Sequence, residues 1–339
     1  MRLSRIPIEL ITLLYLLTYL PYMLITRGLS TMADPGLGKP LSGLQTLPSV
    51  LILSLVMLGL FVWLSGWWRD AHQVRIGAFS VPVPTVWTFL SGVGTSFLLI
   101  TVPLSLTFQD VSIPFIQLLM RGDVLVIAPL VDLVAGRKVR WYSWVALAMV
   151  AAALSLTIWA RNGLHLPPLA IGAVVLYTIG YFIRLAVMTK VAKNGEDHSL
   201  KGYFVEEKMV AMPLTIIVLT AIALSPLSRQ GGELAWGFRD VWTSAAMPWL
   251  ALLSVFFFLV TIFSAVILLD KRENSFCVPF ERAASILAGS LTAFIMAFAF
   301  GQPAPTSSEV IGIVLLIAAI ALLSLAPRWG RRAVIAEAA

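Results

Sequence analysis

Long apolar stretches, separated by short polar segments, recur along the whole of this 339-residue chain. About 20 apolar residues in a helix cross a hydrocarbon core of roughly 30 Å. The pattern predicts ten membrane-spanning helices, at residues 8–26, 47–66, 84–106, 111–135, 141–160, 168–192, 207–225, 245–270, 275–299 and 307–326. A membrane β-barrel would instead show alternating segments of about 10 residues. The expected fold class is therefore an all-α membrane protein.

Composition and charge agree with this class. A mean hydropathy of +0.91, with 59% hydrophobic and 12% charged residues, excludes an ordinary soluble globular protein. Most of the 24 Lys and Arg residues fall in every second loop, and the few in the opposite loops include Arg27. The positive-inside rule then predicts a multi-pass protein of the cell (inner) membrane with both termini cytoplasmic. We interpret the basic charge as a sign of topology and of contact with membrane lipids, and expect no nucleic-acid partner.

The sequence lacks the residues that several kinds of chemistry require. The single cysteine, Cys277, and the three histidines, which lie far apart in predicted loops, predict no metal site and no cofactor. No phosphate-binding loop of the Walker type is present, so ATP is not expected to be the direct energy source. The spans contain no histidine and no acid pair at metal-binding spacing. We therefore do not expect an enzyme, although an intramembrane lipid-modifying enzyme is the alternative from a different class.

Charged residues lie well inside the fourth and the ninth predicted spans. Arg121 and Asp123 occupy the fourth, with Gln117 one turn before Arg121, and Glu281 and Arg282 occupy the ninth. A charge at the bilayer centre costs about 2.5–3.5 kcal/mol on insertion scales, so such residues usually face a cavity or a partner. Two interpretations stay open. The residues line a cavity and contact substrate or a proton, or they form ion pairs that hold two halves of the protein together.

Two further spans carry polar faces. In the sixth, Arg184 follows Tyr181 by three residues and faces either a cavity or, by snorkelling, the inner membrane surface. In the first, Tyr19 lies in a row with Tyr15 and Tyr22, which line a cavity or form an interfacial belt. We include Tyr19, Tyr181 and Arg184 with the candidate substrate-binding residues.

Other polar residues receive a structural interpretation. Ser91 and Thr95 in the third span are typical of helix-packing contacts. Glu206 and Glu207 are expected to open the seventh span, because acidic groups suit a helix N-terminus. Lys208 is expected with the cytoplasmic basic residues.

The chain also shows signs of two related halves. Arg121 and Arg282 hold comparable places in the fourth and ninth spans, after Pro114 and Pro279. Each span leads into a helix rich in small residues, "WVALAMVAAALSL" and "IGIVLLIAAIALLSL". Five spans per half place the second half in the opposite orientation. The expectation is two inverted five-helix repeats, residues 1–163 and 164–339, with a substrate site near the membrane midplane.

This arrangement resembles the drug/metabolite transporter superfamily, in particular its ten-helix members with paired EamA-like domains. The resemblance rests on the ten-span pattern, on "P-x(6)-R" leading to "GRKVRWYSWVALAMVAAALSL", and on a weaker partner at 279–325. In that family a short turn of glycine and glutamate often precedes the fifth and tenth helices. The matching turns here are Gly136-Arg137 and Gly301-Gln302, so the resemblance is to a divergent member.

Together these features predict a secondary-active transporter or exporter that works by alternating access. Guanidinium groups pair well with carboxylates and phosphates, which favours a small polar or amphipathic metabolite with an anionic group. The alternative within transport is a flippase or antiporter for a phosphorylated lipid or a nucleotide sugar. The small-residue faces of the fifth and tenth spans either pack within the protomer or form a homodimer.

Overall fold

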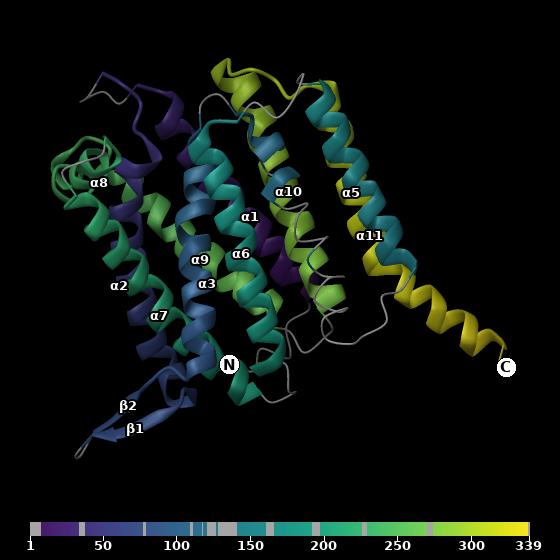
Figure 1. Cartoon of the computed structure of the whole chain (residues 1–339), viewed down its shortest axis with the longest axis horizontal. Coiled ribbons are helices and arrows are strands. Elements are labelled where there is room, and N and C mark those ends of the chain that lie inside the picture. The colour runs from purple at the N-terminus through teal and green to yellow at the C-terminus, as the bar shows by residue number, and fades with distance from the viewer. Residues whose placement is uncertain are drawn as a thin grey trace. The chain divides into compact units, whose positions relative to one another are not determined.

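A computed structural model describes residues 8–33, 38–76, 79–108, 111–116, 118–120, 127, 141–160, 166–191, 197–225, 229–269 and 274–337. Helices make up almost all of these residues (Figure 1). In chain order the elements are α1 (Ile8–Thr31), α2 (Gly43–Ser65), η2 (Trp67–Asp70), β1 (Gln73–Ile76), β2 (Phe79–Pro82), α3 (Val86–Ser105), α5 (Trp141–Ala160), α6 (Pro168–Val191), α7 (Asp197–Ala223), α8 (Arg229–Arg239), η3 (Val241–Thr243), α9 (Met247–Leu268), α10 (Asn274–Phe300) and α11 (Ser307–Glu337).

The helical, apolar character predicted from the sequence is confirmed. In the part of the chain that the structure describes, 6 helical segments are long and apolar enough to cross a membrane: Ile8–Thr31, Gly43–Ser65, Val86–Ser105, Pro168–Val191, Met247–Leu268 and Glu281–Phe300. Most of the predicted fourth span, 111–135, lies outside the described residues. The count of ten spans and their inverted repeat stay predictions.

The chain divides into two compact units. The first consists of residues 1–20, 111–167 and 266–339, and the second of residues 21–110 and 168–265. Each unit draws on both predicted halves, 1–163 and 164–339, which stay a prediction.

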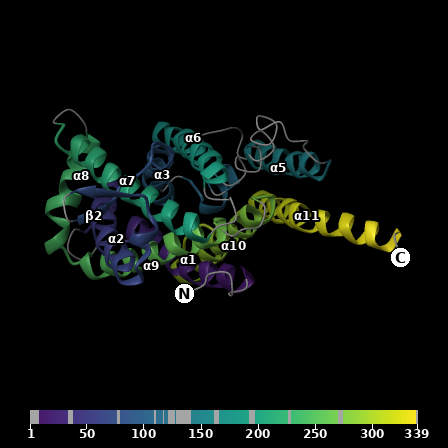
Figure 2. The ribbon, with the colours of Figure 1, turned by 90° about the horizontal axis from the view of Figure 1, so that it is seen from below.

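In the second unit α3 packs against both α6 and α7, and Figure 2 shows α3 and α6 running alongside each other. Glycines permit this close packing. A Cβ added at Gly94 would lie 2.7 Å from the backbone oxygen of Gly180, and one at Gly92 would lie 2.5 Å from Cβ of Val210. Side chains at these positions would push the helices apart, so the glycines set how closely polar groups on α3 approach α6 and α7.

In the first unit α5 packs along α11. Their contact is built from small residues, and the core around it includes Ala146, Ala153, Leu316 and Ala319. A Cβ at Gly312 would lie 2.9 Å from Cδ1 of Leu118. The fifth and tenth predicted spans therefore pack on each other within one protomer, while a homodimer through their remaining faces stays a prediction.

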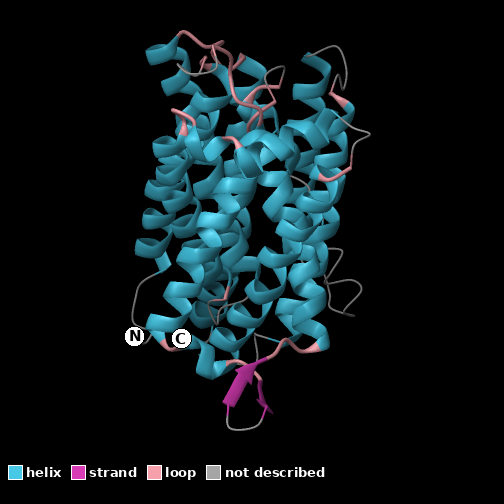
Figure 3. Cartoon of the chain, turned by 90° about the vertical axis from the view of Figure 1, so that its left-hand side faces the viewer, coloured by secondary structure: helices cyan, strands magenta, loops and turns pink. Residues whose placement is uncertain are grey.

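A small β-hairpin, which the hydrophobic pattern did not predict, lies between α2 and α3. Its strands β1 and β2 are antiparallel, with Val74 opposite Val81, and the backbone N–H of Val83 donates to His72 at 2.8 Å. Figure 3 shows the hairpin, in magenta, extending past the ends of the neighbouring helices.

Glu206 on α7 holds both ends of this hairpin. Its Oε1 accepts a hydrogen bond from the backbone N–H of His72 at 2.8 Å. Its Oε2 accepts from the backbone N–H of Thr85, the N-cap of α3, at 3.2 Å and from the hydroxyl of Thr88 at 2.7 Å. One buried carboxylate thus fixes the entry and the exit of the hairpin.

Two sequence expectations are corrected here. α7 begins at Asp197, so Glu206 and Glu207 lie in its third turn and not at a helix N-terminus. Arg27 was expected in an outer loop, but it lies within α1 and is buried, and its guanidinium donates to the backbone oxygen of Phe108 at 2.8 Å. In both cases the helix continues through polar residues because other parts of the second unit satisfy their side chains.

Candidate binding site

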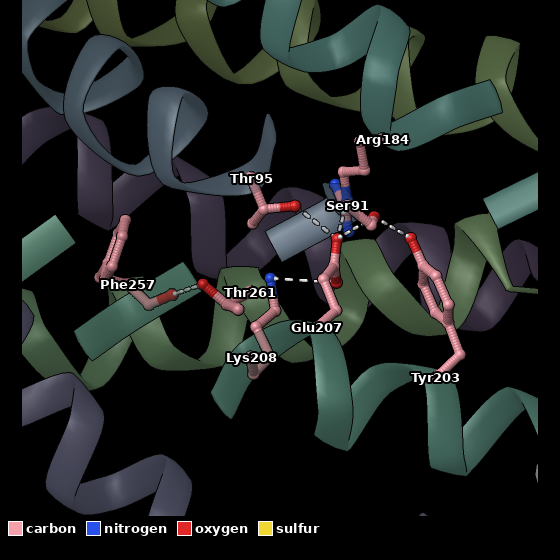
Figure 4. Close-up of polar contacts among 8 residues, drawn as sticks. All are labelled: Ser91, Thr95, Arg184, Tyr203, Glu207, Lys208, Phe257 and Thr261. Carbon is pink, nitrogen blue, oxygen red and sulfur yellow. Dashed lines mark hydrogen bonds and ion pairs between the residues drawn. The ribbon is translucent and has the colours of Figure 1, made fainter. Parts of the chain in front are cut away.

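The centre of the candidate site is the carboxylate of Glu207 on α7 (Figure 4). Its Oε1 accepts a charge-assisted hydrogen bond from Nε of Arg184 on α6 at 2.7 Å. The same oxygen accepts from the hydroxyl of Thr95 on α3, and from that of Ser91 at 3.5 Å. Glu207 is 1% exposed. Two helices, α3 and α6, therefore direct donors onto one buried oxygen of a third helix, α7.

Helical spacing explains how these side chains meet. Ser91 and Thr95 are four residues apart and share one face of α3, which looks toward α7. Tyr203 precedes Glu207 by one turn of α7, and its hydroxyl lies 2.5 Å from Oγ of Ser91. Gly92 and Gly94 on α3 allow the backbones to approach closely enough for these short side chains to reach across.

Lys208 adds a second cation to the site. Its ammonium lies 3.6 Å from Oε2 of Glu207, and the side chain is 4% exposed. Nζ also lies 5.9 Å from the ring centre of Phe204, one turn earlier on α7. Lys208 was expected with the cytoplasmic basic residues, but it is buried beside Glu207.

These residues form what we call the Glu207 cluster: Ser91, Thr95, Arg184, Tyr203, Glu207 and Lys208. These six residues contain two cations and one anion, a formal charge of +1, while the neighbouring buried carboxylate of Glu206 is held by neutral donors of the hairpin and α3. Taking a charge out of water costs several kcal/mol unless a partner compensates it. Arrangements of this kind are rare in apolar helices and commonly mark a place where a charged group binds.

A smaller charged group lies in the first unit. The hydroxyl of Tyr15 on α1 donates to Oε1 of Glu281 on α10 at 3.1 Å. Oε2 of Glu281 lies 3.2 Å from Nε of Arg282, and both residues are buried. The ring of Tyr19 stacks on that of Tyr15, with 5.2 Å between the ring centres.

The structure brings some of the predicted site residues together. Glu281, Arg282 and Tyr19 belong to the group around Tyr15 in the first unit. Arg184 belongs to the Glu207 cluster, where it is buried and paired with Glu207 and does not snorkel to a membrane surface, while its role in substrate binding stays a prediction. Tyr181 is buried in the same unit and stacks on Tyr177, with 6.0 Å between ring centres.

The other three predicted residues, Gln117, Arg121 and Asp123, lie outside the described residues. Ion pairs between Arg121 or Asp123 and the ninth span therefore stay a prediction. Across the residues that the structure describes, no group of three or more His, Cys, Asp or Glu side chains is arranged to hold a metal ion.

Sequence reasoning missed Glu207 and Lys208 as site residues, and it assigned Ser91 and Thr95 to packing. A signal was present, because the apolar residues Tyr203 and Val210 flank Glu207 at helical spacing and extend the apolar pattern of the seventh span backwards. Placing the start of the helix at residue 207 concealed that continuity.

Comparisons with known proteins identify a shared fold but do not indicate a function. No protein-family model matches the chain, and no curated protein matches its sequence. Among solved structures, 22 chains match. One of them, described only as a crystal structure of a protein, is 14% identical, with a TM-score of 0.53 over 95% of this chain and 97% of that chain. A protein of nearly the same length therefore shares this fold.

Proposed function

We propose that this protein is a secondary-active transporter that moves a small polar or amphipathic anion across a membrane by alternating access. The observation that carries the proposal is the Glu207 cluster, in which Arg184, Glu207 and Lys208 are buried with a formal charge of +1. Guanidinium and ammonium groups bind carboxylates and phosphates through charge-assisted hydrogen bonds. A substrate anion would neutralise the positive charge that remains in the Glu207 cluster.

The burial of the cluster supports this role. Lys208 and Glu207 are almost inaccessible to solvent, so a ligand reaches them only when the surrounding helices part. Binding at such a site is coupled to a conformational change, which is the basis of alternating access. Apolar residues in place of a buried ion pair are often equally stable. Stability alone therefore does not account for a buried cluster whose charges do not balance.

The proposal keeps the finer features expected from the sequence. These are ten spans in two inverted repeats, cytoplasmic termini, a location in the cell (inner) membrane, and a resemblance to the drug/metabolite transporter superfamily. In such a repeat architecture the substrate site lies near the midplane of the membrane.

Transport is tested with the purified full-length chain in sealed liposomes. Metabolites are first profiled in cells with and without the protein, and the compounds that change are added to a panel of lactate, succinate, alanine and glycerol phosphate. We expect at least one anion of this set to accumulate in liposomes that contain the protein and not in protein-free liposomes. If none does, the protein is not an anion transporter.

Two variants on α7 sharpen the test. Lys208→Met removes the surplus charge and is expected to lower uptake at least tenfold. Lys201→Gln is the matched control, because Lys201 lies on the same helix and pairs with Asp70 at 3.7 Å in a partly exposed position. Uptake by Lys201→Gln is expected to equal that of the unchanged protein, and equal losses in both variants would contradict a role for the Glu207 cluster.

A further inference from the structure

The two oxygens of the Glu207 carboxylate differ in their partners. Oε1 accepts hydrogen bonds from Arg184, Thr95 and Ser91. Oε2 accepts no hydrogen bond from the residues that the structure describes, and its contact with Nζ of Lys208 is an ionic one at 3.6 Å. Oε1 is saturated, whereas Oε2 can still accept a hydrogen bond.

Lys208 supplies hydrogen-bond donors next to Oε2 of Glu207. An ammonium group carries three N–H donors. In the described part of the chain its ionic and cation–π contacts are with Oε2 of Glu207 at 3.6 Å and with the ring of Phe204, whose centre is 5.9 Å from Nζ. The half of the cluster away from Arg184 therefore offers several donors and one acceptor, 3.6 Å apart, next to an aromatic ring.

The charges restrict what can bind there. The short contact between Arg184 and Glu207 balances one cation with one anion, which leaves the charge of Lys208. A ligand with one negative charge brings the formal charge of the Glu207 cluster to zero. A zwitterion leaves it at plus one and a dianion turns it to minus one, and both leave a charge uncompensated in an apolar setting.

Resting on the transporter function proposed above, we propose that Lys208 and Oε2 of Glu207 bind a small 2-hydroxy monocarboxylate. The ligand carboxylate accepts from the Lys208 ammonium, and its hydroxyl donates to Oε2. The two protein atoms are 3.6 Å apart, a short spacing that a hydroxyl and a carboxylate on neighbouring carbon atoms match. The ring of Phe204 suits an apolar substituent on the same ligand.

Three related compounds test the ligand class on the purified full-length protein. Mandelate has the hydroxyl and one negative charge, phenylacetate lacks the hydroxyl, and phenylglycine carries an ammonium in place of the hydroxyl. We expect mandelate to bind about tenfold more tightly than either of the others, as measured by calorimetry. Equal or tighter binding of phenylglycine or phenylacetate would overturn the assignment.

Substitution of Lys208 separates binding from stability. Lys208→Met is expected to weaken mandelate binding at least tenfold while the melting temperature stays the same or rises, because an uncompensated charge is removed. Lys208→Arg keeps the charge and should bind mandelate more tightly than Lys208→Met. A lower melting temperature for Lys208→Met, with normal mandelate binding by its folded fraction, would show that Lys208 is structural.

Liposome uptake distinguishes failure of this inference from failure of the transporter function. If succinate or glycerol phosphate accumulates and mandelate neither binds nor accumulates, the ligand class is wrong and anion transport stands. If mandelate binds through Lys208 but no compound accumulates, the site is supported and the protein is not a transporter. Lys201→Gln, which leaves the Glu207 cluster intact, should bind mandelate with unchanged affinity.

Discussion

Both compact units contain a buried carboxylate next to an arginine, but the two pairs are built differently. In the second unit Arg184 and Glu207 come from separate helices, α6 and α7, and meet at 2.7 Å. In the first unit Glu281 and Arg282 are neighbours on α10, and their contact is 3.2 Å. The first pair links two helices. The second pair lies within one helix, and the hydroxyl of Tyr15 ties Glu281 to α1.

The charge also differs. The Glu207 cluster includes Lys208 and carries one more cation than anion, whereas the ion pair at Glu281 joins one acid to one base. Removing a cation should therefore have opposite effects in the two places. Loss of Lys208 relieves the surplus positive charge of the Glu207 cluster, while loss of Arg282 takes a neighbouring cation away from the Glu281 carboxylate. The predictions below test this contrast by measuring heat-induced unfolding of the purified protein in detergent.

The largest effect is expected from Glu207→Ala. This change leaves two buried cations, Arg184 and Lys208, without their common partner, and breaking such a pair costs about 3–5 kcal/mol of unfolding free energy. Most of the protein should elute as aggregate on size-exclusion chromatography. A folded variant within about 1 kcal/mol of the unchanged protein would show that Glu207 does not hold α6 against α7.

Arg282→Met should have the next largest effect, about 2–3 kcal/mol, because the charge of Glu281 remains buried after its neighbouring cation is gone. The hydrogen bond from Tyr15 reduces this loss of stability, because it still stabilises the Glu281 carboxylate. The informative comparison is with Lys208→Met, which should unfold no earlier than the unchanged protein. If the two variants lose equal stability, the difference in charge between the Glu207 cluster and the Glu281–Arg282 pair does not affect the free energy of unfolding.

Tyr15→Phe isolates the link between α1 and α10. It removes one hydroxyl, which donates to Glu281 at 3.1 Å, and keeps the ring that stacks on Tyr19. A hydrogen bond to a charged group contributes about 1.5–3 kcal/mol, and we expect a value near the lower limit. Tyr19→Phe, which also keeps the stacking, is the comparison for loss of a hydroxyl one turn further along α1.

The smallest effect is expected from Lys201→Gln. Its contact with Asp70 is 3.7 Å long and partly exposed, so the loss should stay below about 0.5 kcal/mol. A larger loss would mean that electrostatic interactions at the surface of α7 matter as much as those at Glu207, which would remove the reason for singling out the buried residues.

The sequence predicted the helices best where apolar residues run without interruption. α5 and α6 begin at the expected residues, Trp141 and Pro168, because each follows a polar loop and continues as an apolar run. The start of α7 was misplaced by ten residues, since its first turns are polar and are stabilised by distant groups such as His72. The hairpin was missed because its four-residue strands are too short to show a clear alternation of apolar and polar residues.

The site was half predicted for a related reason. A charge inside an apolar run is conspicuous, so Arg184, Glu281 and Arg282 were found. Which carboxylate lies opposite Arg184 depends on the register of α6 against α7, and no single helix encodes that register. A pattern can therefore identify the residue that needs a partner, but the partner itself emerges only from packing.

The hydrogen bonds of Glu206 have a practical consequence for measurement. Glu206 and Glu207 are adjacent on α7, yet the first holds the hairpin and the second holds the buried cluster. A turn of α7 about its axis that loosens Glu207 must also pull on the hairpin. A fluorescent label at Ser80, on an exposed strand residue, would then report in real time what happens at the buried site, from a position that touches none of its residues.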